Sequence, residues 1–185
     1  GANTIMPFTE NQKTETQISF YAATKKACEV LSHSYSHIHN LPITNFRFFT
    51  VYGPWGRPDM APMIFAKSIL SQKPIDVFNN GDMFRDFTYI DDITNGIILC
   101  CSKPATVNTE FDRSNPDPST SFAPHRIFNI GNNKPIELMQ FIQVLEDNLG
   151  LRAIKEFKSM QIGDVQGTYS DTSKLQEWVG FESKT

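Results

Sequence analysis

The strongest constraint on the fold is an alternation, along most of the chain, of helix-like segments with short strand-like segments. Between residues 20 and 39, apolar side chains recur every three or four positions, the spacing of one face of a helix. The next segment, ITNFRFFTVYG (43–53), is rich in β-branched and aromatic residues and ends in glycine before a proline, which is typical of a buried strand. Further helices are expected at residues 61–72, 91–101, 135–149 and 171–178, and further strands at 75–78, 85–90, 126–131 and 154–158. This alternation predicts the α/β class.

Local signals mark the ends of several helices. The Ser19 hydroxyl can accept a hydrogen bond from the first turn of the first helix, and Asp91 or Asp92 can cap the third helix in the same way. Pro135 suits the first turn of the fourth helix, and Gly150 suits the position just past its end. The side of the first helix that faces the core is predicted to consist of Phe20, Ala23, Ala27, Val30, Leu31, Tyr35 and Ile38.

The composition is that of an ordinary soluble domain. The chain has 185 residues, of which 39% are hydrophobic and 20% charged, enough for one domain with a real core. A net charge of −3 and a pI near 5.8 argue against nucleic acid or an acidic membrane as a partner. The chain has no apolar run close to the roughly 20 residues of a membrane span, and its first residues lack a signal-peptide pattern. Cys28, Cys100 and Cys101 are too few for a disulfide framework or a zinc site, so a reducing, cytoplasmic setting without a metal is expected.

A long segment between Lys103 and His125 interrupts the alternation. It contains four prolines and many polar residues. Structureless connections of this length are uncommon in compact domains and are usually functional or disordered. The sequence therefore predicts either a flap over a site or a disordered segment here.

Tyr21 and Lys25 are four residues apart in SFYAATKKACEV (19–30), so they share one face of the first expected helix. An ammonium group close to a phenol stabilises the phenolate, and a tyrosine paired in this way can take a proton from a substrate and return it. The same spacing is common on solvated helix faces. The two residues alone leave both interpretations open, an acid/base pair or an exposed helix surface.

Charged residues in three other segments could bind a ligand. The segment TVYGPWGRPDM (50–60) leaves a buried strand through two sharp turns, and ligands usually bind at the carboxyl ends of strands in open α/β sheets. Arg57 in this segment could hold a carboxylate or phosphate with both arms of its guanidinium, or it could be a surface arginine in a turn. Arg85 has aspartates nearby and is equally compatible with a structural ion pair, while Asp164 could accept a hydrogen bond from a sugar hydroxyl.

Two familiar ligand-binding patterns are missing. The chain has no G-x-G-x-x-G, no G-x-x-G-x-x-G and no P-loop sequence, so nothing in it predicts a cradle for a dinucleotide pyrophosphate. His33 and His37 have a spacing that can bind a metal, but Ser34 stands where a metalloprotease has its glutamate. These histidines are expected at a partly exposed helix end.

Five segments taken together resemble a known family. They occur in this order: YAATKKACE, RFFTVYGPWGRPDM, RDFTYIDDI, RIFNIGNNKPIEL and GDVQGTYSDTSKL. Their order and spacing are similar to the C-terminal part of extended short-chain dehydrogenase/reductases (SDRs), and within that superfamily to nucleotide-sugar epimerases, above all UDP-glucuronate 4-epimerases. The likeness extends over nearly the whole chain. It is most discriminating around Thr50 and Arg57, because many relatives that act on other sugars carry asparagine at the first position and lack the arginine.

The resemblance implies an NAD-dependent isomerase of polysaccharide biosynthesis that uses Tyr21 and Lys25. Tyr21 would be the acid/base that removes the proton of the sugar 4-hydroxyl while hydride passes to NAD. Lys25 would make Tyr21 more acidic and would bind the nicotinamide ribose. The 4-keto sugar would then rotate and receive the hydride on its other face. Relatives dimerise through this helix, so a homodimer is also implied.

The resemblance implies substrate contacts for four further residues. Thr50 and Arg57 would hold the carboxylate of a hexuronate, a group that the guanidinium fork suits well. Arg85 and Asp164 match family positions near the diphosphate and ribose of a UDP-sugar. No nucleic acid and no membrane enter this interpretation.

The chain departs from the family because the family's first half is absent from it. That half carries the glycine-rich cofactor loop, most of the parallel sheet and the catalytic Ser/Thr, and relatives also continue beyond the last residue of this chain. Residues 1–60 are therefore expected to be a remnant of the NAD-binding domain. Residues 61–185 are expected to form mainly the substrate-binding subdomain, with 75–101 partly returning to the Rossmann-like sheet.

The absence of the family's first half makes inactivity the expectation for this chain, with neither appreciable NAD binding nor epimerisation. Two alternatives stay open. The chain could be a non-catalytic remnant that binds a nucleotide sugar, or it could derive from a dehydratase or decarboxylase of the same superfamily.

Overall fold

The computed structural model describes residues 2–161 and 163–185; Gly1, with which the predicted NAD-domain remnant begins, lies outside them, as does Ile162. Helices form at α1 (Phe20–His39), α2 (Ala61–Leu70), α3 (Ile90–Ser102), α4 (Leu138–Leu149) and α5 (Ser173–Val179), with a 3₁₀ turn at Phe78–Gly81. Strands form at β1 (Ile43–Phe48), β2 (Thr50–Tyr52), β3 (Pro74–Val77), β4 (Phe84–Tyr89), β5 (His125–Ile130), β6 (Pro135–Glu137) and β7 (Ile154–Phe157). The predicted α/β class is confirmed.

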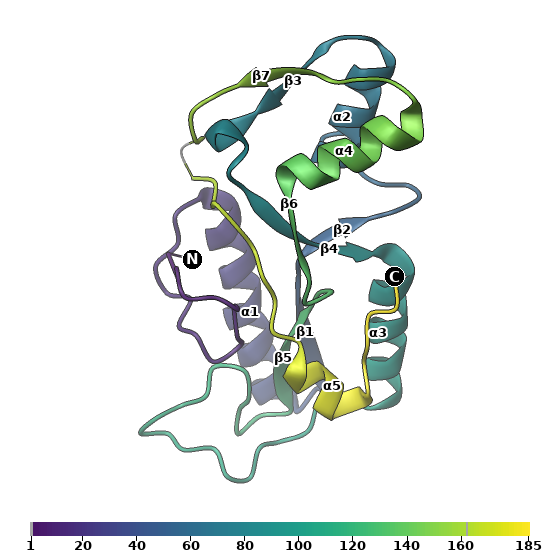
Figure 1. The fold of residues 1–185 in the computed structure, drawn as a ribbon. Coiled ribbons are helices and arrows are strands. Elements are labelled where there is room, and N and C mark those ends of the chain that lie inside the picture. Colours follow the sequence, from purple (N-terminus) through teal and green to yellow (C-terminus); the bar gives the residue numbers. More distant parts are fainter. Residues whose placement is uncertain (1, 162) are drawn as a thin grey trace.

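The strands pair mostly in parallel. β1 pairs in parallel with β5, β2 with β4, and β3 with β7, while β6 runs antiparallel to β4. In Figure 1, α1 lies on one side of β1 and β5, and α3 and α5 lie on the other. Helices α2 and α4 lie beside β3 and β7 at the opposite end of the molecule, with β2 and β4 between the two ends (Figure 1).

The predicted strand over 43–53 is divided at Phe49 into β1 and β2. β1 pairs with β5 from Ile43 to Phe48, whereas β2 pairs with β4 from Thr50 to Tyr52. The Phe49 amide still donates to the Ile130 carbonyl at 3.2 Å, so the backbone stays extended across the division. The sequence shows one apolar run here because both parts are extended and partly buried.

Helix α1 begins as predicted, but its apolar face is exposed. The Ser19 hydroxyl accepts from the Ala22 amide at 3.2 Å, which confirms the N-cap. The side chains of Phe20, Leu31 and Ile38 are 95%, 68% and 72% exposed, so the prediction that this side faces the core is wrong. The face that packs on β1 and β5 is polar instead, because its side chains find partners there.

Two other predicted helix starts are wrong. Pro135 lies in β6 rather than in the first turn of α4, because the Pro135–Glu137 segment pairs with β4 before the helix begins at Leu138. Tyr89 occupies the N-cap position of α3. Asp92 instead accepts hydrogen bonds from the Ser183 hydroxyl and the Lys184 and Thr185 amides at 2.8–3.1 Å. Gly150 does end α4, with φ of +67°.

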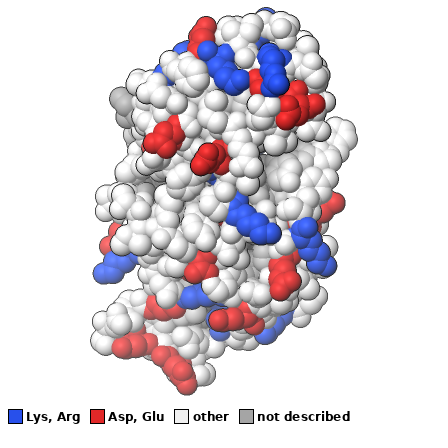
Figure 2. All heavy atoms as spheres, in the orientation of Figure 1, with Lys and Arg blue, Asp and Glu red and all other residues white. Residues whose placement is uncertain are grey.

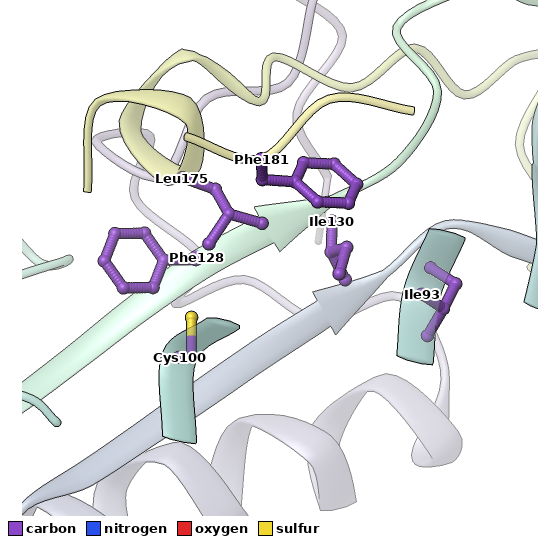
Figure 3. Close-up of a cluster of buried hydrophobic side chains, with 6 residues drawn as sticks. All are labelled: Ile93, Cys100, Phe128, Ile130, Leu175 and Phe181. Carbon is purple, nitrogen blue, oxygen red and sulfur yellow. The ribbon is translucent and has the colours of Figure 1, made fainter. Parts of the chain in front are cut away.

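Two apolar clusters hold the helices against the strands. The first joins α3, β5 and α5, and Figure 3 shows its side chains converging: Ile93, Cys100, Phe128, Ile130, Leu175 and Phe181. The second joins α2, β3 and α4 through Phe65, Ile69, Ile75, Val77 and Ile142. Gly96 lets α3 approach the first cluster closely, since a Cβ there would lie 2.5 Å from Ile130 Cδ1.

The segment between Lys103 and His125 is irregular but docked along its second half. Ser119, Ser121 and Ala123 are buried. The Ile127 amide donates to the Ser119 carbonyl at 2.9 Å, and Lys174 Nζ donates to Ser119 Oγ at 2.6 Å. We call this segment the docked arm, because its second half packs against the rest of the domain.

The surface carries both signs of charge. Figure 2 shows Lys and Arg interspersed with Asp and Glu over one face. In the part of the chain that the structure describes, no helix combines the length and the apolar character needed to cross a membrane. The division into residues 1–60 and 61–185 stays a prediction.

Candidate active site

Tyr21 and Arg57 line the same cleft. The cleft has a volume of about 540 Å³, and the end of β1, β2 and the loop after β2 form most of its wall. Tyr21 comes from the first turn of α1 and Arg57 from the loop between β2 and α2. The fold thus brings together two residues that are far apart in the sequence and for which the family resemblance implies roles.

Lys25 lies beside Tyr21, one helical turn further along α1. Its Nζ is 5.3 Å from the centre of the Tyr21 ring, and both side chains are exposed. Both line a second recess, of about 350 Å³. Tyr21 therefore lines two recesses, one shared with Arg57 and one shared with Lys25.

The floor of the second recess is an ion-pair network. Arg47 donates to both oxygens of Glu29, at 2.7 and 3.0 Å, and Lys26 donates to Glu29 Oε2 at 3.0 Å. Burial alone would raise the pKa of Glu29, but the hydrogen bonds from Arg47 and Lys26 hold it below its usual value. The network fixes α1 against β1 and leaves Lys25 at the rim.

Thr50, Arg85 and Asp164 line a third recess, of about 180 Å³. Met60 belongs to the walls of both this recess and the cleft of Tyr21 and Arg57, so the two adjoin. Arg85 donates to Asp164 Oδ1 at 3.0 Å and to the Gln166 carbonyl at 3.0 Å. Burial lowers the pKa of Arg85, and the carboxylate of Asp164 opposes that shift.

Arg57 is paired with Asp59, a residue that the sequence interpretation did not single out. Arg57 Nε donates to Asp59 Oδ1 at 3.2 Å and Nη2 to Oδ2 at 3.0 Å. Both side chains are about two-thirds exposed, at 65% and 68%. The spacing Arg-Pro-Asp could have suggested this pair, because a proline between two charged residues restricts how far they can separate.

The loop that carries Arg57 has a restricted backbone. Gly53 has φ of +136°, and a Cβ there would lie 2.6 Å from Ile90 Cγ2, so only glycine fits. Trp55 has φ of +63° and a fully exposed indole at the rim of the cleft. A bulky residue with positive φ is uncommon and often lies at a ligand site.

The histidines of α1 pack against the docked arm. His33 Nε2 lies 2.6 Å from Ser121 Oγ, and the His33 and His37 rings both contact Phe122 edge-on. Among residues 2–161 and 163–185, the His, Cys, Asp and Glu side chains nowhere gather in a group of three or more that could hold a metal ion.

Comparison with known proteins identifies the family. Residues 1–138 match the NAD dependent epimerase/dehydratase family. Over 185 residues the chain is 48% identical to Protein CapI of Staphylococcus aureus, covering all of this chain and 55% of that protein. It is 43% identical over 183 residues to a probable UDP-glucuronate 4-epimerase of Rhizobium meliloti, covering 98% of this chain and 54% of the relative. The chain thus spans about half the length of the curated relatives it matches.

A solved structure agrees with the sequence comparison. UDP-glucuronic acid 4-epimerase from Bacillus cereus, in complex with UDP-glucuronic acid and NAD, superposes with a TM-score of 0.74. The identity is 29%, and the match covers 95% of this chain and 54% of that one. The predicted resemblance is confirmed at the level of the fold and the family. The chain belongs to the NAD dependent epimerase/dehydratase family.

Proposed function

We propose that this chain is the part of an NAD-dependent nucleotide-sugar 4-epimerase that carries the catalytic tyrosine and the substrate-binding residues, and that its substrate is UDP-glucuronate. One observation carries the proposal. Tyr21 and Arg57 line one cleft, and that cleft adjoins a recess lined by Thr50, Arg85 and Asp164.

The substrate assignment follows from the chemistry of the two cavities. A hexuronate has a carboxylate on its sugar ring, and Arg57 offers a guanidinium fork for it beside Tyr21. Thr50 contributes a hydroxyl from the adjoining recess, where Arg85 and Asp164 would contact the diphosphate and ribose. The Bacillus cereus epimerase is described as a complex with UDP-glucuronic acid and NAD, which supports the same ligands here.

Tyr21 would move the proton of the reaction. As phenolate, it takes the proton of the sugar 4-hydroxyl when C4 is oxidised, and it returns the proton to the 4-keto oxygen when C4 is reduced. NAD, when bound, supplies the acceptor and donor of the hydride. Lys25, with its Nζ 5.3 Å from the ring centre, stabilises the negative charge on Tyr21 through most of the cycle. Rotation of the keto sugar between the two steps inverts C4.

Two residues of this chain would contact one end of an NAD molecule. The recess shared by Tyr21 and Lys25 offers an ammonium group to ribose hydroxyls next to the acid/base. The sequence contains no glycine-rich dinucleotide loop for the pyrophosphate. We therefore propose that Tyr21 and Lys25 hold the nicotinamide ribose and that appreciable NAD binding needs residues beyond this chain.

Binding without catalysis is the second candidate function. It is favoured by the presence of Thr50, Arg57, Arg85 and Asp164 within this chain, while the cofactor loop is absent from it. In this second candidate function, the chain binds a UDP-sugar and catalyses no reaction on it. A dehydratase or decarboxylase origin would keep the same fold and differ in groups outside the chain.

The test is a chimera that joins this chain to the glycine-rich first half of a UDP-glucuronate 4-epimerase. We expect it to interconvert the C4 epimers of UDP-glucuronate and to lose that activity in Tyr21→Phe. A folded, NAD-loaded chimera that converts neither UDP-glucuronate nor UDP-glucose would contradict the proposed reaction. Loss of water or of CO₂ from the substrate would instead indicate the dehydratase or decarboxylase alternative.

A homodimer through α1 belongs to the same proposal. The exposed side chains Leu31, Tyr35 and Ile38 follow one another along α1 at the four- and three-residue steps of a helix–helix seam, and the exposed Phe20 lies about three helical turns before Leu31. Exposed apolar stripes on long helices usually mark an interface. A second copy of the same stripe would bury it symmetrically. A cytoplasmic role in polysaccharide biosynthesis is the setting that we propose for such an enzyme.

A further inference from the structure

Asp59 is hydrogen-bonded to the guanidinium of Arg57, the group that would bind the carboxylate of the proposed substrate. Asp59 uses both carboxylate oxygens on Nε and Nη2 of Arg57, at 3.2 and 3.0 Å. This edge of a guanidinium is one that binds a carboxylate in bidentate fashion. An incoming carboxylate of the same geometry would therefore compete directly with Asp59.

The backbone keeps Asp59 next to Arg57. Pro58 stands between them with its φ fixed by the ring, and the Met60 amide donates to the Arg57 carbonyl at 3.2 Å. The turn that results carries both side chains on one short loop, of which Arg57 and Met60 line the cleft. The carboxylate of Asp59 is therefore held close to Arg57 whether or not a ligand is bound.

The pair is nevertheless easy to exchange. Both side chains are about two-thirds exposed, at 65% and 68%, and water screens such pairs strongly. An exposed pair of this kind weakens the binding of a competing carboxylate to the arginine by only about two- to five-fold. The Asp59 contact can therefore weaken a competitor for Arg57 without excluding it.

We infer that Asp59 is the counter-ion that the carboxylate of a UDP-hexuronate displaces from Arg57, and that it sets the affinity and selectivity of this site. The inference rests on the proposed function. A ligand with a carboxylate recovers the interaction that Asp59 gives up. A neutral UDP-hexose has no group to exchange, so Arg57 stays paired with Asp59 and adds nothing to its binding. Asp59 is a positioning residue in this scheme, because it acts through Arg57.

The experiment is an NMR titration of the 185-residue chain with UDP-glucuronate and, in parallel, with UDP-glucose. We expect Asp59→Asn to tighten UDP-glucuronate binding by about two- to five-fold and to leave UDP-glucose binding unchanged. Asp59→Glu should restore the wild-type affinity, because it restores the carboxylate. Glu177→Gln removes the same charge from an exposed position on α5 and should change neither affinity.

A double-mutant cycle tests whether Asp59 acts through Arg57. In an Arg57→Gln background, Asp59→Asn should no longer affect UDP-glucuronate. The inference is overturned if Asp59→Asn changes the affinity for both ligands equally, or if it still changes the affinity for UDP-glucuronate in the Arg57→Gln background. Either result would mean that the net charge of the protein causes the change. Circular dichroism melting of each variant shows that the differences come from folded protein.

The outcomes separate the inference from the proposed function. If Arg57→Gln weakens UDP-glucuronate selectively while Asp59→Asn has no effect, the uronate site stands and the inference falls. If the wild-type chain does not distinguish the two ligands and Arg57→Gln changes neither, both fall together. Absence of binding by the wild-type chain at millimolar ligand overturns the inference, and the proposed reaction is then decided by the chimera.

Discussion

Asp86 and Ser170 are joined inside the protein although 84 positions separate them in the chain: the backbone N–H of Ser170 donates to Asp86 Oδ2 at 3.0 Å, and its hydroxyl donates to the same oxygen. The amides of Asn132 and Asn133 also donate to this carboxylate, at 2.9 and 3.1 Å. One fully buried side chain thus connects β4, the turn after β5 and the segment before α5.

Removal of the Asp86 carboxylate is expected to destabilise the fold. Asp86→Ala would leave buried donors without an acceptor, and we expect the free energy of unfolding to fall by about 3 kcal/mol in urea denaturation. Asp91→Asn, five positions further along at an exposed site, should change it by less than about 0.5 kcal/mol. An equal effect of the two substitutions would argue that general charge, and not this hydrogen-bond network, is responsible.

Overpacking at Gly96 is expected to destabilise the first apolar cluster. The new methyl of Gly96→Ala would lie 2.5 Å from Ile130 Cδ1 and 3.0 Å from Phe181 Cδ2. We expect a net loss of about 1–2 kcal/mol in thermal or urea unfolding, even though alanine favours the helix more than glycine does. Asn95→Ala, at the exposed neighbouring position of α3, should be neutral or slightly stabilising. Stabilisation by Gly96→Ala would contradict close packing of α3 against Ile130 and Phe181.

Acidification is expected to destabilise the protein through His125. Burial, with a smaller contribution from the neighbouring His33, lowers the pKa of His125 to about 4 from the ordinary value of 6.5. The unfolded chain then binds more protons than the folded chain between these two values. The free energy of unfolding should therefore fall as the pH drops from 6.5 to 4, by up to about 3 kcal/mol.

The measurement is a series of urea unfolding curves across this pH range. His125→Asn should flatten the slope, whatever its effect on the absolute stability, because asparagine does not titrate. Replacement of the exposed His39 serves as the matched control and should leave the slope unchanged. An unchanged slope in His125→Asn would show that other groups dominate.

The isolated chain is expected to be catalytically silent. Since its sequence has no glycine-rich cofactor loop, purified protein mixed with NAD and UDP-glucuronate should show no epimer formation above a Tyr21→Phe control. Product analysis by chromatography is a sufficient measurement. Turnover above that control would mean that this chain binds the cofactor by residues that its motifs do not reveal.

Self-association is expected to depend on the exposed face of α1. Light scattering of the wild-type chain at increasing concentration should show a dimer, and Leu31→Asp should shift it to monomer by placing a charge in the apolar stripe. Lys73→Asp, remote from α1 on the short connection before β3, controls for the added negative charge. A wild-type chain that stays strictly monomeric at high concentration would contradict the proposed seam.

Much of the fold could be predicted because local patterns and local structure agree. The N-cap at Ser19 and the stop at Gly150 are set by neighbouring residues alone, and both are observed. The division at Phe49 and the start of α4 after β6 could not be predicted, because they depend on which distant strand each segment pairs with. The prediction that the apolar side of α1 faces the core was wrong for a different reason. Periodicity shows that a helix has two faces, but it does not show which face packs against the rest of the protein.

The candidate site was predictable only in part. The sequence singled out Tyr21, Lys25, Arg57, Arg85 and Asp164, and their roles remain proposals. The structure adds that these residues line three recesses with common wall residues: Tyr21 and Phe48 belong to the first and second, and Met60 belongs to the first and third. Asp59 was missed because a surface ion pair two positions apart has no periodic signature, and the Arg-Pro-Asp spacing was the one local signal for it.

The docked arm before β5 also decides where this chain can be engineered. Residues 112–116 are exposed, whereas Ser119, Ser121 and Ala123 are buried. A fluorophore, an affinity tag or a protease site grafted into the first of these stretches would project from the end of the molecule opposite α2 and α4 (Figure 1). The same graft a few residues later would displace part of the interior. Within this long connection, only a short exposed stretch is therefore suitable for attaching a label or tag.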